Sequence, residues 1–215
     1  VSNDFGNVES VNASFSVVDA NATNGLVGWW KFDETNSSIA YDSSVFGRNG
    51  FLIGFDSNTT QWVQGKIGGA LQFDGTDDYV NIDGYKGILG SSPRTTAAWV
   101  KTNLSTAAIL SWGSSGSSIK WTFRIQANDG LTGATRVETH GGIIVGNTVV
   151  NDNQWHQVAA VLPAGSDNVN QVVLYVDGAN AGSSYSASRT INTVSGSDVV
   201  VGKKKQNLME LTAPF

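Results

Sequence analysis

The chain has 215 residues, of which 40% are hydrophobic and 14% charged, enough for one large domain with a buried core. Its formal net charge of −5 argues against nucleic acid or an anionic membrane surface as a partner. The absence of cysteine excludes disulfides, thiol catalysis and cysteine-metal sites, and no run of about 18 apolar residues could span a bilayer.

The first 24 residues differ in character from the rest of the chain. Apolar side chains alternate with Asn and Ser, so that Val11, Ala13, Phe15 and Val17 share one face of a predicted strand. A linker of small residues, 19–24, follows. One strand is not a domain, so this strand must close a preceding domain, pair with the main domain, or pair with another molecule. We therefore divide the chain into a leader, residues 1–24, and a main domain, residues 25–215.

The main domain is predicted to be all-β, a two-sheet antiparallel sandwich of the jelly-roll type. Short apolar or alternating runs are separated by Gly, Asn, Asp and Ser, and no convincing helix occurs. The runs that we interpret as strands, with a weaker one at Thr190–Thr193, are Leu26–Phe32, Ala70–Phe73, Tyr79–Ile82, Thr95–Lys101, Ala107–Trp112, Trp121–Gln126, Thr135–Glu138, Ile143–Val145, His156–Leu162, Val172–Val176 and Val199–Val201.

Several of these blocks carry a family resemblance. They read LVGWWKFDE (26–34), WVQGKIGGALQFDGTDDYVNI (62–82), NDNQWHQVAAVL (151–162) and VVLYVDG (172–178). In order and spacing they resemble the laminin-G-like, concanavalin A-like jelly rolls, a superfamily that includes the pentraxins. The leader resembles the last strand of an immunoglobulin-like repeat. The resemblance implies an extracellular or cell-surface module that binds glycans, proteins or calcium, or that serves as a structural repeat.

Catalysis is not expected, although the superfamily includes glucanases. Glycosidases need two carboxylates that face one groove about 5 Å apart. The four glutamates are scattered, and the neighbouring Asp33 and Glu34 would point to opposite faces of a strand. Neither histidine, His140 or His156, belongs to a recognisable triad, and in relatives the Trp-His pair of the QWHQVAAV block is structural. We therefore predict that the protein is not an enzyme.

A weak calcium site is predicted at Asp77 and Asp78, close to Asp74, because Ca²⁺ prefers carboxylate oxygens on a loop. In pentraxin-like relatives this loop supplies some ligands, and an acidic loop after the strand matching Val199–Gly202 supplies the others. Here the second loop begins with Lys203–Lys205, whose charge would repel a divalent ion. The alternative is that Asp74 and Asp77 only close turns beside glycine. No other cofactor is expected.

Glycans are the second class of ligand that we consider. Most of the seven tryptophans fall inside predicted strands and are expected in the core. Tyr85 and Tyr185 fall in predicted loops and are the better candidates for exposed aromatic contacts. Sequons for N-glycosylation, whose number barely exceeds chance, occur at Asn12, Asn21, Asn36, Asn58 and Asn103.

The leader supplies a strand that the main domain lacks. In the resembling family the strand matching Val199–Val201 is followed by a closing strand, and here Phe215 is the last residue. Three alternatives follow: Val11–Val18 of one copy pairs into a neighbour near Val199–Val201 or Leu208–Phe215, the sequence is an excerpt of a larger protein, or the leader fills its own groove.

The function expected first is therefore a structural module that assembles into a fibre or surface filament with other copies of itself. The alternative is a carbohydrate-binding or adhesion module next to other domains of a larger surface protein. Neither alternative involves nucleic acid or membrane insertion.

Overall fold

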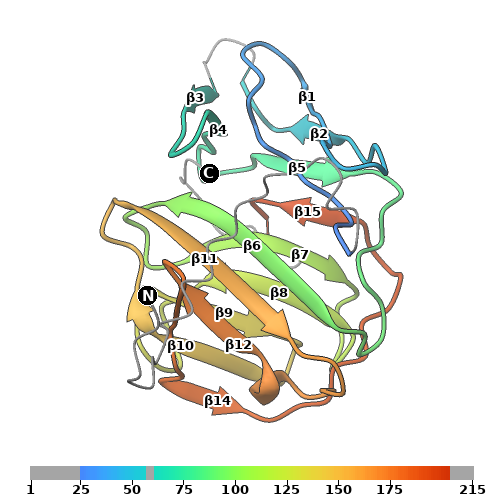
Figure 1. The fold of residues 1–215 in the computed structure, drawn as a ribbon, viewed down its shortest axis with the longest axis vertical. Coiled ribbons are helices and arrows are strands. Elements are labelled where there is room, and N and C mark those ends of the chain that lie inside the picture. Colours follow the sequence, from blue (N-terminus) through green and yellow to red (C-terminus); the bar gives the residue numbers. More distant parts are fainter. Residues whose placement is uncertain (1–24, 57–60, 204–215) are drawn as a thin grey trace, which may run out of the picture.

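The computed structural model describes residues 25–56 and 61–203. In this part of the chain two main antiparallel sheets pack face to face, which confirms the predicted two-sheet jelly roll. Figure 1 shows β6, β11 and β12 lying in front of β7, β8, β9 and β10. Within the described residues there is no helix long and apolar enough to cross a membrane.

The larger sheet contains nine strands in the described residues, in the order β1-β2-β5-β15-β7-β8-β9-β10-β14. Their bounds are β1 Ile39–Ala40, β2 Gly50–Ile53, β5 Tyr79–Ile82, β7 Ala107–Gly113, β8 Lys120–Ile125, β9 Ala134–Glu138, β10 Ile143–Val149, β14 Tyr185–Ala187 and β15 Val199–Val201. The smaller sheet contains four strands in the same residues, β13 Ala179–Asn180, β12 Val173–Val176, β11 Trp155–Leu162 and β6 Arg94–Lys101. A separate hairpin joins β3 Trp62–Gln64 to β4 Gly69–Leu71, and one 3₁₀ turn, η1, covers Val169–Gln171.

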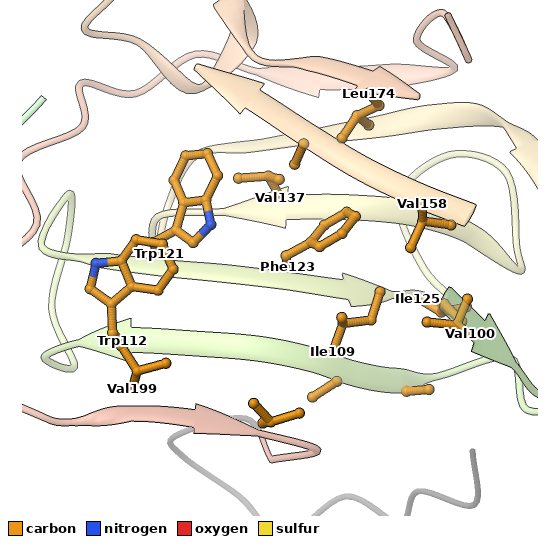
Figure 2. Packing of buried hydrophobic residues seen from close by; sticks show 14 of the residues in the cluster. Val100, Ile109, Trp112, Trp121, Phe123, Ile125, Val137, Val158, Leu174 and Val199 are labelled. Carbon is orange, nitrogen blue, oxygen red and sulfur yellow. The ribbon is translucent and has the colours of Figure 1, made fainter. Parts of the chain in front are cut away.

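The core lies between the two sheets, as the alternation of apolar residues predicts. Figure 2 shows Trp112, Trp121 and Phe123 on β7 and β8 pointing toward Val158 and Leu174 of the smaller sheet. The two indole rings stack with their centroids 5.7 Å apart. Of the tryptophans expected in the core, Trp112 and Trp121 lie in it and Trp30 packs against it, whereas Trp29, Trp99 and Trp155 are half-buried outside it.

Three strand predictions are wrong. Of Leu26–Phe32 only Trp30 is bridged, to Asp42, and Phe32 has a positive φ of 60°, which a regular strand cannot contain. Thr190–Thr193 makes two isolated bridges rather than a strand. Tyr185, predicted in a loop, lies on β14, whose polar residues gave no strand signal because β14 is an exposed edge.

The structure also decides where a donated strand could pair. Val199–Val201, one of the proposed acceptors, is β15, which is hydrogen-bonded to β5 on one side and β7 on the other. No edge is left there, so that acceptor is wrong. The leader (with Val11, Ala13, Phe15 and Val17) and Leu208–Phe215 lie outside the described residues, and filament assembly stays a prediction.

Two of the five sequons fall in the described residues. Asn36 and Asn103 are both exposed, as an acceptor of a glycan must be. The other three, Asn12, Asn21 and Asn58, lie outside the described residues.

Candidate functional site

Tyr185 lies at one edge of the nine-stranded sheet and is 44% exposed. It pairs with Val145 of β10, which pairs with Arg136 of β9, which in turn pairs with Arg124 of β8. Because directly opposed residues share a face of a sheet, Tyr185 is on the same face as the two arginines. This face is the one turned away from Val137 and Phe123 in the core.

A network of charged side chains occupies that face. Glu138 accepts hydrogen bonds from Lys120 at 2.5 Å, from Arg124 at 3.2 Å and from Arg136 at 3.0 Å. The other guanidinium nitrogen of Arg136 lies 3.1 Å from a carboxylate oxygen of Asp129. Burial is the largest influence on Arg124 and lowers its pKa, against the opposing effect of the Glu138 charge. Two carboxylates thus balance three buried cations across β8 and β9.

The loop between β8 and β9 brings this network against Tyr185. Asp129 and Gly130 have positive φ values of 62° and 103°, and a Cβ on Gly130 would lie 2.9 Å from Cβ of Tyr185. Only glycine permits this approach. The amide of Leu131 donates to Ser184 Oγ at 3.0 Å, which fixes the loop to the residue before Tyr185. We call Tyr185, Asp129, Arg136 and Glu138 the Tyr185 corner.

Two polar atoms on this face lack hydrogen bonds. Arg136 Nε and Gln126 Oε1 are both buried, and neither has a hydrogen-bond partner among the described residues. An unsatisfied buried polar group costs on the order of 1–3 kcal/mol. The Tyr185 corner therefore presents an exposed aromatic ring next to a loop whose half-exposed Asp129 carboxylate is held by Arg136, while Arg136 itself stays buried. The sequence indicated only the tyrosine, because the other residues come from separate strands and a turn.

Tyr85, the second tyrosine expected to be exposed, is half-buried instead. Its ring packs against the core, and the guanidinium of Arg48 lies 4.1 Å from the ring centroid. Burial raises the pKa of Tyr85. The ring is thus already covered by a cation, which makes it a poor sugar platform.

The structure brings Asp74, Asp77 and Asp78 together, with one oxygen of each within 4.8 Å of the others. Two oxygens that bind the same Ca²⁺ at about 2.4 Å can lie up to about 4.8 Å apart, so the spacing fits one ion. Asp78 Oδ2 accepts the amide of Asp74 at 2.8 Å, whereas the buried Oδ1 of Asp78 has no hydrogen-bond partner in the described residues. Gly54 holds this loop, since a Cβ there would lie 2.5 Å from the carbonyl oxygen of Asp77.

Asp78 is only 9% exposed, and this burial is the main reason that its pKa is raised from 3.8 to about 6. The charges of Asp74 and Asp77 raise the pKa further, while the amide of Asp74 lowers it. A buried carboxylate beside two others is unfavourable until a proton or a cation neutralises it. The donor set therefore fits a calcium ion. Lys203, the described residue of the lysine run, packs on Tyr79, with its Nζ 3.9 Å from the ring centroid.

Asp33, Glu34 and His156, the residues considered as catalytic carboxylates or bases, have structural partners, whereas the side chain of His140 does not show one among the described residues. Asp33 accepts the amide of Gly69 and Glu34 accepts the amide of Tyr41, so the two neighbours bind different parts of the chain, although they do not lie on a strand. His140 is exposed, with a positive φ of 59°.

His156 lies between two carboxylates. Its Nδ1 is 2.7 Å from Asp177 and its Nε2 is 3.1 Å from Asp152. Burial lowers the pKa of His156, but the hydrogen bonds with the two aspartates outweigh it, and the net pKa is raised. The imidazole thereby ties the start of β11 to the turn after β12, which agrees with a structural role.

Comparisons with known proteins agree with this fold. The profile of a laminin G family, described as the Concanavalin A-like lectin/glucanases superfamily, matches residues 74–214. No curated protein sequence matches the chain. Among solved structures, the chain is similar to domain 4 of AbnA, a GH43 extracellular arabinanase from Geobacillus stearothermophilus, in complex with arabinotriose. The TM-score is 0.64 at 18% identity, over 88% of this chain and 89% of that chain.

A second similar structure is the LG4-5 domain pair of the mouse laminin alpha1 chain, with a TM-score of 0.48 at 12% identity. That alignment covers 76% of this chain and 43% of the laminin chain. The profile match spans more than half of the sequence and falls on the sandwich described above. The chain belongs to the Concanavalin A-like lectin/glucanases superfamily.

Proposed function

We propose that this protein is a non-catalytic, extracellular carbohydrate-binding module whose ligand is an oligosaccharide. The observation that carries the proposal is the Tyr185 corner, where an exposed aromatic ring lies next to the loop that carries the half-exposed Asp129 carboxylate. Support comes from domain 4 of the arabinanase, which has the same fold and whose structure contains arabinotriose. Fold alone does not assign a ligand, so the residues of the corner carry the argument.

The chemistry of the corner suits a sugar. The apolar face of a pyranose or furanose ring can stack on Tyr185, because an aromatic ring offers a flat apolar surface and a polar hydroxyl. The Asp129 carboxylate, with its side chain 50% exposed, can accept hydrogen bonds from ring hydroxyls. Arg136 is too buried to touch the sugar, and its part is to hold the Asp129 carboxylate through Nη1. The ion pair with Arg136 thus orients Asp129 for this contact.

Replacing Tyr185 by alanine is expected to weaken oligosaccharide binding at least tenfold, since the loss of a stacked ring removes about 1.4 kcal/mol or more. Isothermal titration calorimetry with arabinotriose, followed by a glycan array, measures this. Tyr41→Ala is the matched control, because Tyr41 is 52% exposed beside β1, at the opposite edge of the same sheet. Wild-type protein that binds no glycan on the array, or equal losses in both variants, would refute the proposed site. Release of reducing sugar from a bound glycan would refute the non-catalytic role.

We also propose that the Asp74, Asp77 and Asp78 loop binds a structural calcium ion. The buried Oδ1 of Asp78, which has no described hydrogen-bond partner, supports this because a cation would supply the missing interaction. Asp74 and Asp77 are exposed and would complete the oxygen set together with water. Calcium here would anchor the turn that leads into β5.

Asp78→Asn is expected to raise the free energy of unfolding at pH 7 without calcium. The folded-state pKa of Asp78 lies above the ordinary value, so the folded protein binds this proton more tightly and loses stability as the pH rises from about 4 to about 6. The full shift corresponds to about 3 kcal/mol, and we expect about 1–2 kcal/mol because exposed Asp74 and Asp77 are screened by solvent. Urea unfolding between pH 4 and pH 7 measures the effect.

Millimolar calcium is expected to stabilise the wild-type protein and to have much less effect on Asp78→Asn. Asp83→Asn, which changes an exposed aspartate after β5, serves as the control and should respond to calcium as the wild type does. If calcium leaves the wild-type unfolding curve in place, the loop is a proton-binding turn and not a metal site.

The same proposal covers location and partners. An oligosaccharide-binding module of this superfamily, with exposed sequons at Asn36 and Asn103, is suited to the outside of a cell, beside other domains of a larger protein.

A further inference from the structure

The longest unpaired edge in the smaller sheet belongs to β6. In the described residues this sheet runs β13-β12-β11-β6, so the eight residues of β6, Arg94–Lys101, pair only with β11. Every second residue of an edge strand turns its N–H and C=O groups away from its neighbour. Such an edge accepts a further strand readily.

Cationic side chains flank the far end of this edge. Lys101 is the last residue of β6, and Lys66, in the turn of the β3–β4 hairpin, lies with its Nζ 5.8 Å from the ring centroid of Trp99 on β6. The hairpin thus reaches over this end of the strand. A strand with acidic residues near Lys66 and Lys101 would be favoured by charge.

A series of contacts leads from the first described residues toward the opposite end of β6. The carbonyl of Val27 accepts a hydrogen bond from Arg48, whose guanidinium stacks on Tyr85. Arg94, the first residue of β6, donates to the carbonyl of Ile88 at 2.8 Å, three residues after Tyr85. A chain of contacts therefore joins the residues after Gly25 to the start of β6.

Two segments outside the described residues could fill the edge, and their sequences differ. Residues 1–24 contain Asp4, Glu9 and Asp19 and no lysine or arginine, and they carry the alternating run 11–17. Residues 204–215 begin with two lysines, contain a proline and do not alternate. Both the charge and the period-two pattern favour the leader.

We propose that Val11–Val18 of the leader pairs antiparallel with β6 of its own chain and so adds a fifth strand to the smaller sheet. The linker 19–24 spans up to about 20 Å when extended, and it enters at the Arg94 end of β6. An antiparallel strand then runs from Val17 near Arg94 to Val11 near Lys101, which places Glu9 close to Lys66 and Lys101. A tethered strand competes at millimolar effective concentration, and for this reason we choose the same chain over a second copy.

Hydrogen–deuterium exchange of the full chain tests the pairing. The quantity measured is the exchange rate of those β6 amides that point away from β11. Phe15→Asp should increase their exchange rate at least tenfold and lower the midpoint of thermal unfolding by about 5 °C, because it puts a charge on the face of the leader that meets the core. Ser16→Asp adds the same charge to the opposite face and should leave both quantities close to wild type. The protein should remain monomeric by light scattering at every concentration.

A charge exchange gives a second, milder test in case Phe15→Asp fails to fold. Glu9→Lys and Lys101→Glu should each speed exchange of β6 several-fold, and the two together should restore the wild-type rate. Rapid exchange of β6 in the wild type would overturn the proposal. Protection of β6 that is lost on dilution would also overturn it, because that result indicates pairing with a second copy. So would protection that is removed by Leu211→Asp and kept in Phe15→Asp, because that result indicates pairing with residues 204–215.

Discussion

Glu138→Gln is expected to lower the free energy of unfolding by about 3–5 kcal/mol, one of the two largest effects that we predict. The side chain of Glu138 is only 5% exposed and binds Lys120, Arg124 and Arg136. A glutamine keeps the shape of the side chain but leaves three buried cations facing one another without their central negative charge. Removal of one member of a buried ion network typically costs this much.

Asp129→Asn provides the control for Glu138→Gln within the same network. The Asp129 side chain is 50% exposed and binds only the outer nitrogen of Arg136, so its loss should change stability by less than about 1 kcal/mol. Urea unfolding at pH 7, with unchanged m-values, measures both variants. A Glu138→Gln protein within 1 kcal/mol of the wild type would show that the three cations do not depend on this carboxylate.

Arg94→Lys is expected to cost about 3 kcal/mol of unfolding free energy, although it keeps the charge. Arg94 is buried, and its three nitrogens donate to the carbonyls of Ser92, Ile88 and Gly90 and to the hydroxyl of Thr193 at 2.7–2.9 Å. Its guanidinium also lies near the rings of two core tryptophans. An ammonium group cannot reach all of these acceptors, and each hydrogen bond lost from a buried charged donor costs about 1.5–3 kcal/mol.

Lys101→Met, at the other end of β6, is the control for Arg94→Lys and should cost less than about 1 kcal/mol because Lys101 is only half-buried. Burial is also the main cause of the lowered pKa of Arg94, at about 10, so this group stays charged over the working range of pH. If Arg94→Lys unfolds at the wild-type urea concentration, the guanidinium does not organise the loop that leads into β6.

The sequence predicted correctly those structural features that depend only on residues close together in the chain. The runs of β6 and β11 form strands as predicted, and their inward positions Val100, Val158 and Ala160 reach the core because alternate residues of a strand share one face. The Asp74–Asp78 cluster was visible because its three carboxylates lie on one short turn. Polar edge strands such as β14 were not predicted, because their residues do not pack in the core and therefore show no alternation of apolar and polar residues.

The sequence by itself thus determined an all-β sandwich, its core strands and the acidic loop. The tertiary structure alone decided what depends on strands distant in sequence. It placed Tyr185 on the same face as Arg136 and against the loop that carries Asp129, because β14 pairs with β10, and β10 with β9. Within residues 25–56 and 61–203, it enclosed β15 between β5 and β7 and put β6 at the edge of the smaller sheet. Strand order is set by how the two sheets bury a common core, and no short segment of sequence contains that information.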